Sequence, residues 1–226
     1  MRAFTSLFSV AILAMGSLPP LGVSSQVPPA LQKDVLTRSA KIGDVSLPAI
    51  SAFEGALLVS GVPGGVAFAQ GCSDQPLPMV RPQGTTLREV LDSITGGDSS
   101  YVWRMNNAVV NLEPLRGVPA LLTTLLKTYD SQELAEPGSA VTLLISSPEV
   151  TRAATKLGMA HNVSGSALSG IGSEPRRPKK PLGIRLHDLT LLEALNAIVR
   201  ANKHGVWTYR ETHCGSDHQY DVTFSE

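Results

Sequence analysis

Apolar residues recur at helical spacing in two segments that lie 104 positions apart. The apolar positions of the two segments are Leu87, Val90, Leu91 and Ile94, and Leu191, Ala194, Leu195 and Ile198. This spacing places the apolar side chains on one face of a helix. We therefore predict one amphipathic helix in each segment.

Each predicted helix opens with a capping box. The first is Thr86-x-x-Glu89 and the second is Thr190-x-x-Glu193. A threonine hydroxyl at this position can accept a hydrogen bond from the amide three residues on, and the glutamate can reach back to the cap amide. We interpret Glu89 and Glu193 as capping residues rather than as a catalytic pair of carboxylates.

A strand and a hairpin are predicted after each helix. Residues 101–105 and 108–112 alternate around a turn at Asn106-Asn107, and residues 206–209 and 220–224 flank a turn at 214–217. Short runs rich in β-branched and aromatic residues, separated by turn residues, are typical of antiparallel hairpins. Both segments therefore indicate the same order of strand, helix and hairpin.

The two segments are an internal duplicate. Residues 80–105 align with residues 184–209 without a gap, and eight of the 26 aligned positions are identical. Ordinary composition would give roughly one or two identities. The identical positions include Trp103 and Trp207, which are the only tryptophans of the chain. One supersecondary unit is therefore expected to occur twice.

The remaining pattern predicts an α+β fold of two related small modules. Each module would pack two helices on short mixed or antiparallel strands. An N-terminal arm is expected at 26–39, and Gly64-Gly65 is expected to end the first helix of the first module. The predicted modules are 40–116 and 117–226, the second with a flexible Gly-, Ser- and Pro-rich insertion at 161–181.

The predicted modules resemble the secretin and TonB N-terminal short domain. That family has a strand, a helix, two strands, a second helix and a closing hairpin. Its second helix opens with a motif that stands here as Thr190-Leu191-Leu192-Glu193-Ala194-Leu195, and more loosely at 86–91. The resemblance implies small periplasmic modules that bind other proteins. No long series of alternating β segments follows, so we expect tandem modules without a pore or barrel.

The N-terminal residues predict export. Arg2 is followed by an uncharged, largely apolar run at 4–18 and by small residues at 23–25. This pattern predicts a signal peptide at 1–25 and a periplasmic or secreted protein. Cleavage near Gly16 and an uncleaved anchor are the alternatives. No later stretch is long and apolar enough to span a bilayer, so we expect no membrane span after signal removal.

Composition and charge narrow the classes of partner. The chain has 226 residues, of which 42% are hydrophobic and 17% are charged, as in globular proteins. Its 19 basic and 19 acidic side chains give a formal net charge of zero. No broad electrostatic field would draw it to nucleic acid or to anionic lipid. We therefore expect no nucleic-acid partner.

The two cysteines and a histidine cluster are the candidate chemistry. In an oxidising compartment, Cys72 and Cys214 would form one disulfide, and two unpaired thiols are the alternative. His213, Cys214 and His218 lie in the final predicted hairpin and could hold zinc, or could simply be a solvated loop. We predict no cofactor and no catalytic residue, and the alternative hypothesis is an envelope enzyme or metal-binding protein that uses this cluster.

The favoured hypothesis is a non-catalytic binding protein that engages another envelope or periplasmic protein. The candidate binding residues are Trp103, Trp207, Arg81 and Arg185, which recur in both segments. The tryptophans would either cover the capped helices as core residues or form an exposed aromatic patch. Binding would use strand addition to a sheet edge or this aromatic face.

Overall fold

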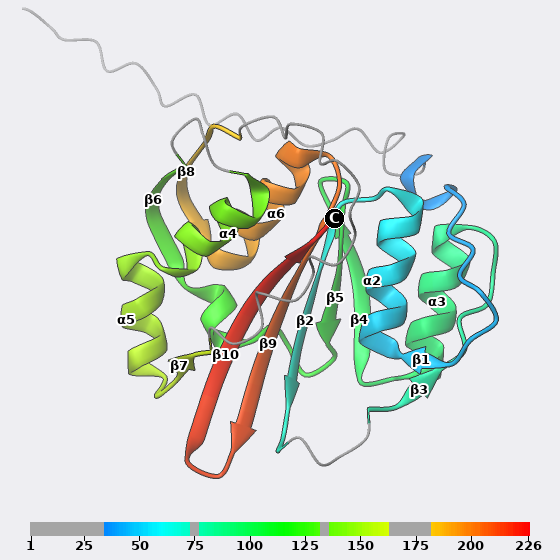
Figure 1. Cartoon of the computed structure of the whole chain (residues 1–226), viewed down its shortest axis with the longest axis horizontal. Helices are drawn as coiled ribbons and strands as arrows, with labels where there is room; N and C mark the ends of the chain where they lie inside the picture. Colours follow the sequence, from blue (N-terminus) through cyan, green and yellow to red (C-terminus); the bar gives the residue numbers. More distant parts are fainter. Residues whose placement is uncertain (1–33, 73–76, 132–135, 163–181) are drawn as a thin grey trace, which may run out of the picture.

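The computed structural model describes residues 34–72, 77–131, 136–162 and 182–226 (Figure 1). The predicted signal peptide, the first part of the predicted arm and nearly all of the predicted insertion lie outside these residues. Val35 and Leu36, from the end of the arm, are buried in the core. Within the described ranges, no helix has the length and apolar character needed to cross a membrane.

Helices and strands follow one another in a mixed order, which confirms the predicted α+β class. The first part of the chain contains β1 (Leu47–Pro48), α2 (Ala49–Ser60), β2 (Gly64–Gln70), β3 (Met79–Val80), α3 (Leu87–Gly97), β4 (Tyr101–Asn106) and β5 (Val109–Pro114). The second part contains η1 (Ala120–Thr123), β6 (Leu125–Ser131), α4 (Pro137–Ile145), α5 (Pro148–Lys156), β7 (Ala160–His161), β8 (Ile184–Thr190), α6 (Leu191–Asn202), β9 (Val206–Cys214) and β10 (Asp217–Ser225).

A single six-stranded sheet runs through both parts, in the order β4-β5-β2-β9-β10-β7. The two parts meet where β2 pairs in parallel with β9, from Gly64 opposite Val206 to Gln70 opposite Thr212. There are also two small antiparallel sheets, β1 with β3 and β6 with β8, and an isolated antiparallel bridge between Ser39 and Thr86. The local sequence patterns do not predict the junction between β2 and β9, because it joins segments distant in the chain.

The helices of the two parts cover opposite faces of this sheet (Figure 1). Helices α2 and α3 pack on one face, and α4, α5 and α6 lie over the other. Successive residues of a strand point to opposite faces. Accordingly, Val206 belongs to the core under α2 and α3, whereas Trp207 belongs to the core under α4 and α6.

Both predicted capping boxes are formed. The Oγ1 atoms of Thr86 and Thr190 accept hydrogen bonds from the amides of Glu89 and Glu193, at 3.4 and 3.2 Å. The carboxylate of Glu89 in turn accepts from the amides of Thr85 and Thr86, and these bonds lower its pKa to about 2. Capping therefore accounts for both glutamates, as predicted.

The end of helix α2 differs from the prediction. The helix ends at Ser60 and is capped by Gly61, which adopts the left-handed conformation at φ 62°, whereas Gly64 and Gly65 are the first residues of β2. The prediction that Gly64-Gly65 ends the helix was therefore wrong. A Cβ atom at Gly65 would overlap the indole ring of Trp207. Gly65 thus serves the close approach of β2 to this side chain rather than a turn.

We expect Gly65→Ala to lower the free energy of unfolding by about 2 kcal/mol, because an added methyl group overpacks a filled core. Gly55→Ala is the matched control, since Gly55 lies inside α2 and a Cβ atom there meets open space. Alanine should raise stability at Gly55 by about 0.5 kcal/mol. Urea unfolding of both variants checks the result, and equal effects would contradict the packing of Trp207 on Gly65.

Candidate binding site at the edge of the sheet

Strand β4 forms one edge of the six-stranded sheet. It is joined to β5 by a two-residue turn at Asn107 and Ala108, whose φ angles are 51° and 62°. Two positive φ angles define a type I′ turn, which closes on a hydrogen-bonded residue pair. That pair is Asn106 with Val109, and hydrogen-bonded pairs then alternate along the hairpin.

This alternation decides which backbone groups of β4 face outward. The residues between the hydrogen-bonded pairs are Tyr101, Trp103 and Met105, so their amide and carbonyl groups point away from β5. The amide of Tyr101 donates to the carbonyl of Asp98 at 3.4 Å. Among the described residues, β5 is the sole strand that pairs with β4, so the outward groups of Trp103 and Met105 are free to pair with another strand.

The edge carries few of the features that block strand pairing. Proteins often protect such edges with proline, a bulge or lysine. Strand β4 has no proline or lysine, and it pairs with β5 residue for residue, without a bulge. Its one charged residue, Arg104, lies with its Nε 3.5 Å from a carboxylate oxygen of Glu113 on β5. The guanidinium is therefore held over the sheet, and burial raises the pKa of Glu113 while Arg104 opposes that shift.

The three residues whose backbone groups face away from β5 also have half-buried side chains. Tyr101, Trp103 and Met105 alternate on one face of β4 and pack against the core under α2 and α3. The indole Nε1 of Trp103 donates to Asp92 at 2.8 Å, and the guanidinium of Arg88 lies 5.4 Å from its ring centroid. The partly exposed side of this row would contact the side chains of any added strand.

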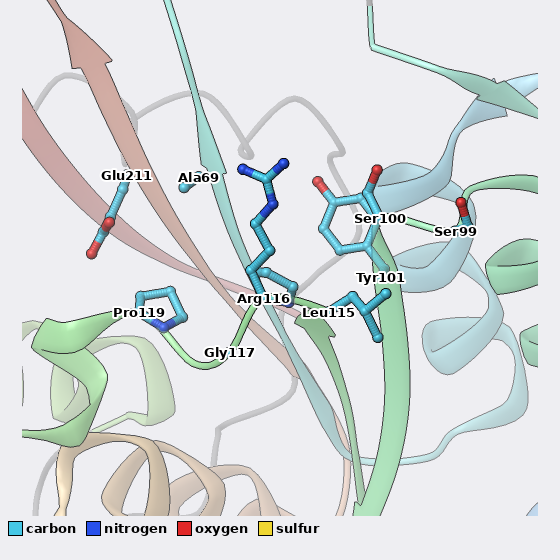
Figure 2. Close-up of a pocket in the computed structure, with 10 residues that line it drawn as sticks. Ala69, Ser99, Ser100, Tyr101, Leu115, Arg116, Gly117, Pro119 and Glu211 are labelled. Atoms are coloured by element: carbon cyan, nitrogen blue, oxygen red, sulfur yellow. The ribbon is translucent and has the colours of Figure 1, made fainter.

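A pocket of about 540 Å³ opens at the N-terminal end of β4 (Figure 2). It lies between the start of β4, the connection after β5 and the far ends of β2 and β9. Its lining includes Ala69, Tyr101, Arg116 and Glu211. Burial, and secondly Asp98, raise the pKa of Tyr101, so its phenol stays protonated at neutral pH and can donate. We use "edge site" for the outward side of β4 together with this pocket.

Glu211 is a buried carboxylate whose two oxygens both have partners. Oε1 accepts from the hydroxyl of Tyr209 at 2.5 Å, and Oε2 lies 3.1 Å from Nε2 of His213. Burial, and then the hydrogen bond to Glu211, raise the pKa of Tyr209 well above its ordinary value. The three side chains follow one another along one face of β9, so the alternation of the strand builds this chain of contacts.

The predicted zinc cluster is not assembled. Cys214 forms a disulfide with Cys72, with 4.7 Å between the Cα atoms, so it offers no thiolate to a metal. His213 and His218 are cross-strand partners whose rings meet edge to face at 4.9 Å. In the described ranges, no three His, Cys, Asp or Glu residues are grouped so that they could hold a metal ion. The disulfide removes the sulfur ligand that the zinc hypothesis requires, and it is the state found for the two cysteines.

The aromatic-patch hypothesis was wrong for Trp207. Its side chain is fully buried, and its Nε1 donates to Asn196 of α6 at 2.9 Å. Trp103 makes the corresponding bond to Asp92, which occupies the position equivalent to Asn196 at the offset of 104. The two tryptophans lie on opposite faces of the sheet and cannot form one patch. Only Trp103 keeps an exposed side.

Arg81 and Arg185 lie at the two small sheets, away from the edge site. Nε of Arg81 is 3.2 Å from Asp44, and Nε of Arg185 is 3.0 Å from Asp130. Both arginines are largely exposed, and surface ion pairs of this kind contribute little to stability. The structure does not bring either arginine together with a tryptophan, so the four predicted binding residues do not form one site.

Sequence reasoning named Trp103 but missed Arg116 and Glu211. Arg116 lies in a connection without a motif, and Glu211 meets its partners through the pairing of β9, so neither carried a local signal. The free edge of β4 could have been found only by knowing the strand order. Comparison with known proteins found no match for this chain among family models, curated proteins or solved structures.

Proposed function

We propose that this chain is an exported, non-catalytic binding protein that takes an extended segment of another envelope protein as an added strand on β4. The observation that carries the proposal is the outward backbone groups at Trp103 and Met105, on an edge with which no other strand of the described residues pairs. In strand addition, backbone hydrogen bonds supply affinity and alternate side chains supply specificity. Here the half-buried row of Tyr101, Trp103 and Met105 would favour apolar residues at alternate positions of the partner.

The two parts of the chain are, in this proposal, related modules that resemble the secretin and TonB N-terminal short domain. In support of this relation, the two parts have the same order of helices and strands, apart from one extra helix in the second part. The first part is β1-α2-β2-β3-α3-β4-β5 and the second is β6-α4-α5-β7-β8-α6-β9-β10. Both carry a formed capping box and an indole hydrogen bond to the same helix position. The sheet orders β4-β5-β2 and β9-β10-β7 also correspond.

This correspondence supplies a precedent for strand addition within the chain. Strands β4 and β9 occupy equivalent positions, and each pairs on one side with the second strand of its hairpin. The other side of β9 is occupied by β2, which pairs over seven residues in parallel. The same side of β4 is free among the described residues. The partner segment would therefore occupy on β4 the place that β2 takes on β9.

Export to the periplasm is part of the proposal. Two observations support it. The N-terminal residues 1–25 have the pattern of a signal peptide, and Cys72 and Cys214 are paired in a disulfide. Disulfides persist in oxidising compartments and are rare in the cytosol. A non-catalytic role agrees with a site built from backbone groups, aromatic side chains and an arginine rather than from a nucleophile beside a base.

Met105→Pro should abolish binding, because proline removes the outward amide that a partner strand needs. The variant should still fold, since that amide makes no bond to β5 and proline is tolerated on the solvent side of edge strands. Met105→Thr is the control, because threonine keeps the amide and favours strands. Cross-linking in cells of the source organism, read by mass spectrometry, should recover the same partner with wild type and Met105→Thr but not with Met105→Pro.

Two outcomes would contradict the proposal. Recovery of the same partner with Met105→Pro, in a protein whose near-UV circular dichroism matches wild type, would exclude the β4 edge. A concentration-dependent dimer that Met105→Pro abolishes would mean that a second copy of this chain, and not another envelope protein, occupies the edge. Analytical ultracentrifugation of the three proteins distinguishes this second case.

A further inference from the structure

Arg116 is an unpaired cation in the pocket of the edge site. It is exposed, and within the described part of the chain its guanidinium makes no hydrogen bond or ion pair. The arginines at 81, 104, 185 and 210 instead each lie within 4 Å of a carboxylate. A free guanidinium in a cavity is suited to a planar anion, because its fork of donors can bind both oxygens of a carboxylate.

Among the described residues that line the pocket, Glu211 is the one carboxylate, and it does not pair with this arginine. Both oxygens of Glu211 are already engaged, by the hydroxyl of Tyr209 and by His213. In Figure 2 the guanidinium of Arg116 lies between Ala69 and the phenol of Tyr101, and the carboxylate of Glu211 points away from it. The side of the pocket near the start of β4 therefore presents donors, from Arg116 and from the protonated phenol of Tyr101.

The position of the pocket relates Arg116 to the proposed partner segment. Tyr101 is opposite Pro114 in the hairpin, and Arg116 follows Pro114 by two residues, so its side chain lies just beyond the N-terminal end of β4. Strand β2 runs parallel to β9, and a segment in the equivalent place would run parallel to β4. The residue before its first paired position would then lie at the mouth of the pocket.

From this geometry we propose that Arg116 selects partner segments with an aspartate or glutamate directly before the strand that pairs with β4. This inference rests on the proposed strand addition and adds its specificity. The acidic side chain would reach into the pocket and accept hydrogen bonds from Arg116 and from the hydroxyl of Tyr101. The occupant is thus an acidic residue followed by alternating apolar residues.

The test uses two displayed heptapeptide libraries, whose selected members are then synthesised with an acetylated N-terminus and an amidated C-terminus. One library has glutamate at the first position and the other has glutamine, and the remaining six positions are random. Peptides selected on the purified wild-type protein are synthesised in both forms, and fluorescence anisotropy measures their affinity. The glutamate form should bind about tenfold more tightly, as expected for a charge-assisted hydrogen bond. Arg116→Gln should remove this difference, and Arg116→Lys should restore part of it.

The outcomes separate this inference from the proposal on which it rests. If selected peptides lose binding with Met105→Pro, but their glutamate and glutamine forms bind equally, strand addition stands and the role of Arg116 is wrong. If the difference in affinity between the glutamate and glutamine forms persists in Arg116→Gln, another group recognises the acidic side chain and the inference fails. If selected peptides synthesised again with a free C-terminal carboxylate bind more tightly than their amidated forms, the segment runs antiparallel to β4 and the acidic-residue inference is overturned. If neither library yields a peptide whose binding depends on Met105, the proposed function fails as well.

Discussion

Breaking the Cys72–Cys214 disulfide is expected to lower the free energy of unfolding by about 4 kcal/mol. The bond joins residues separated by 142 positions, and cross-links that close long loops restrict the unfolded chain most. It also extends the ladder between β2 and β9, because Gln70 pairs with Thr212 two residues before the cysteines. Without it, the backbone pairing of β2 with β9 and the packing around it must hold the two parts of the sheet together.

Urea unfolding with and without dithiothreitol measures this effect, and a Cys72→Ser, Cys214→Ser double variant provides the control. The double variant should match the reduced wild-type protein and should not respond to the reductant. A loss below about 1 kcal/mol would contradict the view that the disulfide is a main link between the two parts. Because both cysteines are exposed, the reductant has access to the folded protein.

Trp207→Ala is expected to be equally severe, at about 4 kcal/mol, whereas Trp103→Ala should cost about 1 kcal/mol. Removing a fully buried tryptophan leaves a cavity, and such changes typically cost 3–5 kcal/mol. Trp207 is fully buried and contacts Gly65, and its indole donates to Asn196. Trp103 makes the equivalent bond to Asp92 but keeps a partly exposed ring at the edge of the sheet.

The same pair can be separated by fluorescence in variants that keep the fold. Trp103→Phe leaves Trp207 as the only tryptophan, and its emission should be blue-shifted and protected from a soluble quencher such as iodide. In Trp207→Phe, emission from Trp103 should be quenched by iodide and should change when a peptide binds the edge site. Equal quenching of the two single-tryptophan proteins would contradict the different burial of the two rings.

The edge site shows why a candidate binding surface is harder to predict from sequence than a helix or a strand. The duplicated pattern singled out Trp103, since it is part of a repeat, but it singled out the buried Trp207 for the same reason. The identity of the two tryptophans reflects folding, because each indole donates a hydrogen bond to the capped helix of its own repeat. Arg116 lies outside the repeat, and its proposed role depends on its place beside β4, which no local pattern records.

The sequence by itself determined the features that depend on near neighbours in the chain. Helical periodicity and the Thr-x-x-Glu motifs predicted α3 and α6 with their caps, and turn residues predicted the hairpins β4–β5 and β9–β10. These features rest on contacts within a few residues, so a short window contains their physical cause.

Only the tertiary structure decided the features that depend on residues far apart in sequence. The pairing of β2 with β9 placed the two helical layers on opposite faces, buried Trp207 and brought Cys72 to Cys214. β2 also occupies one side of β9, whereas the equivalent side of β4 is free among the described residues. The candidate site therefore lies at Trp103 and Met105 rather than at both tryptophans. Strand order is set by burial and hydrogen bonding summed over the whole sheet, and periodicity within one strand contains no information about its neighbours.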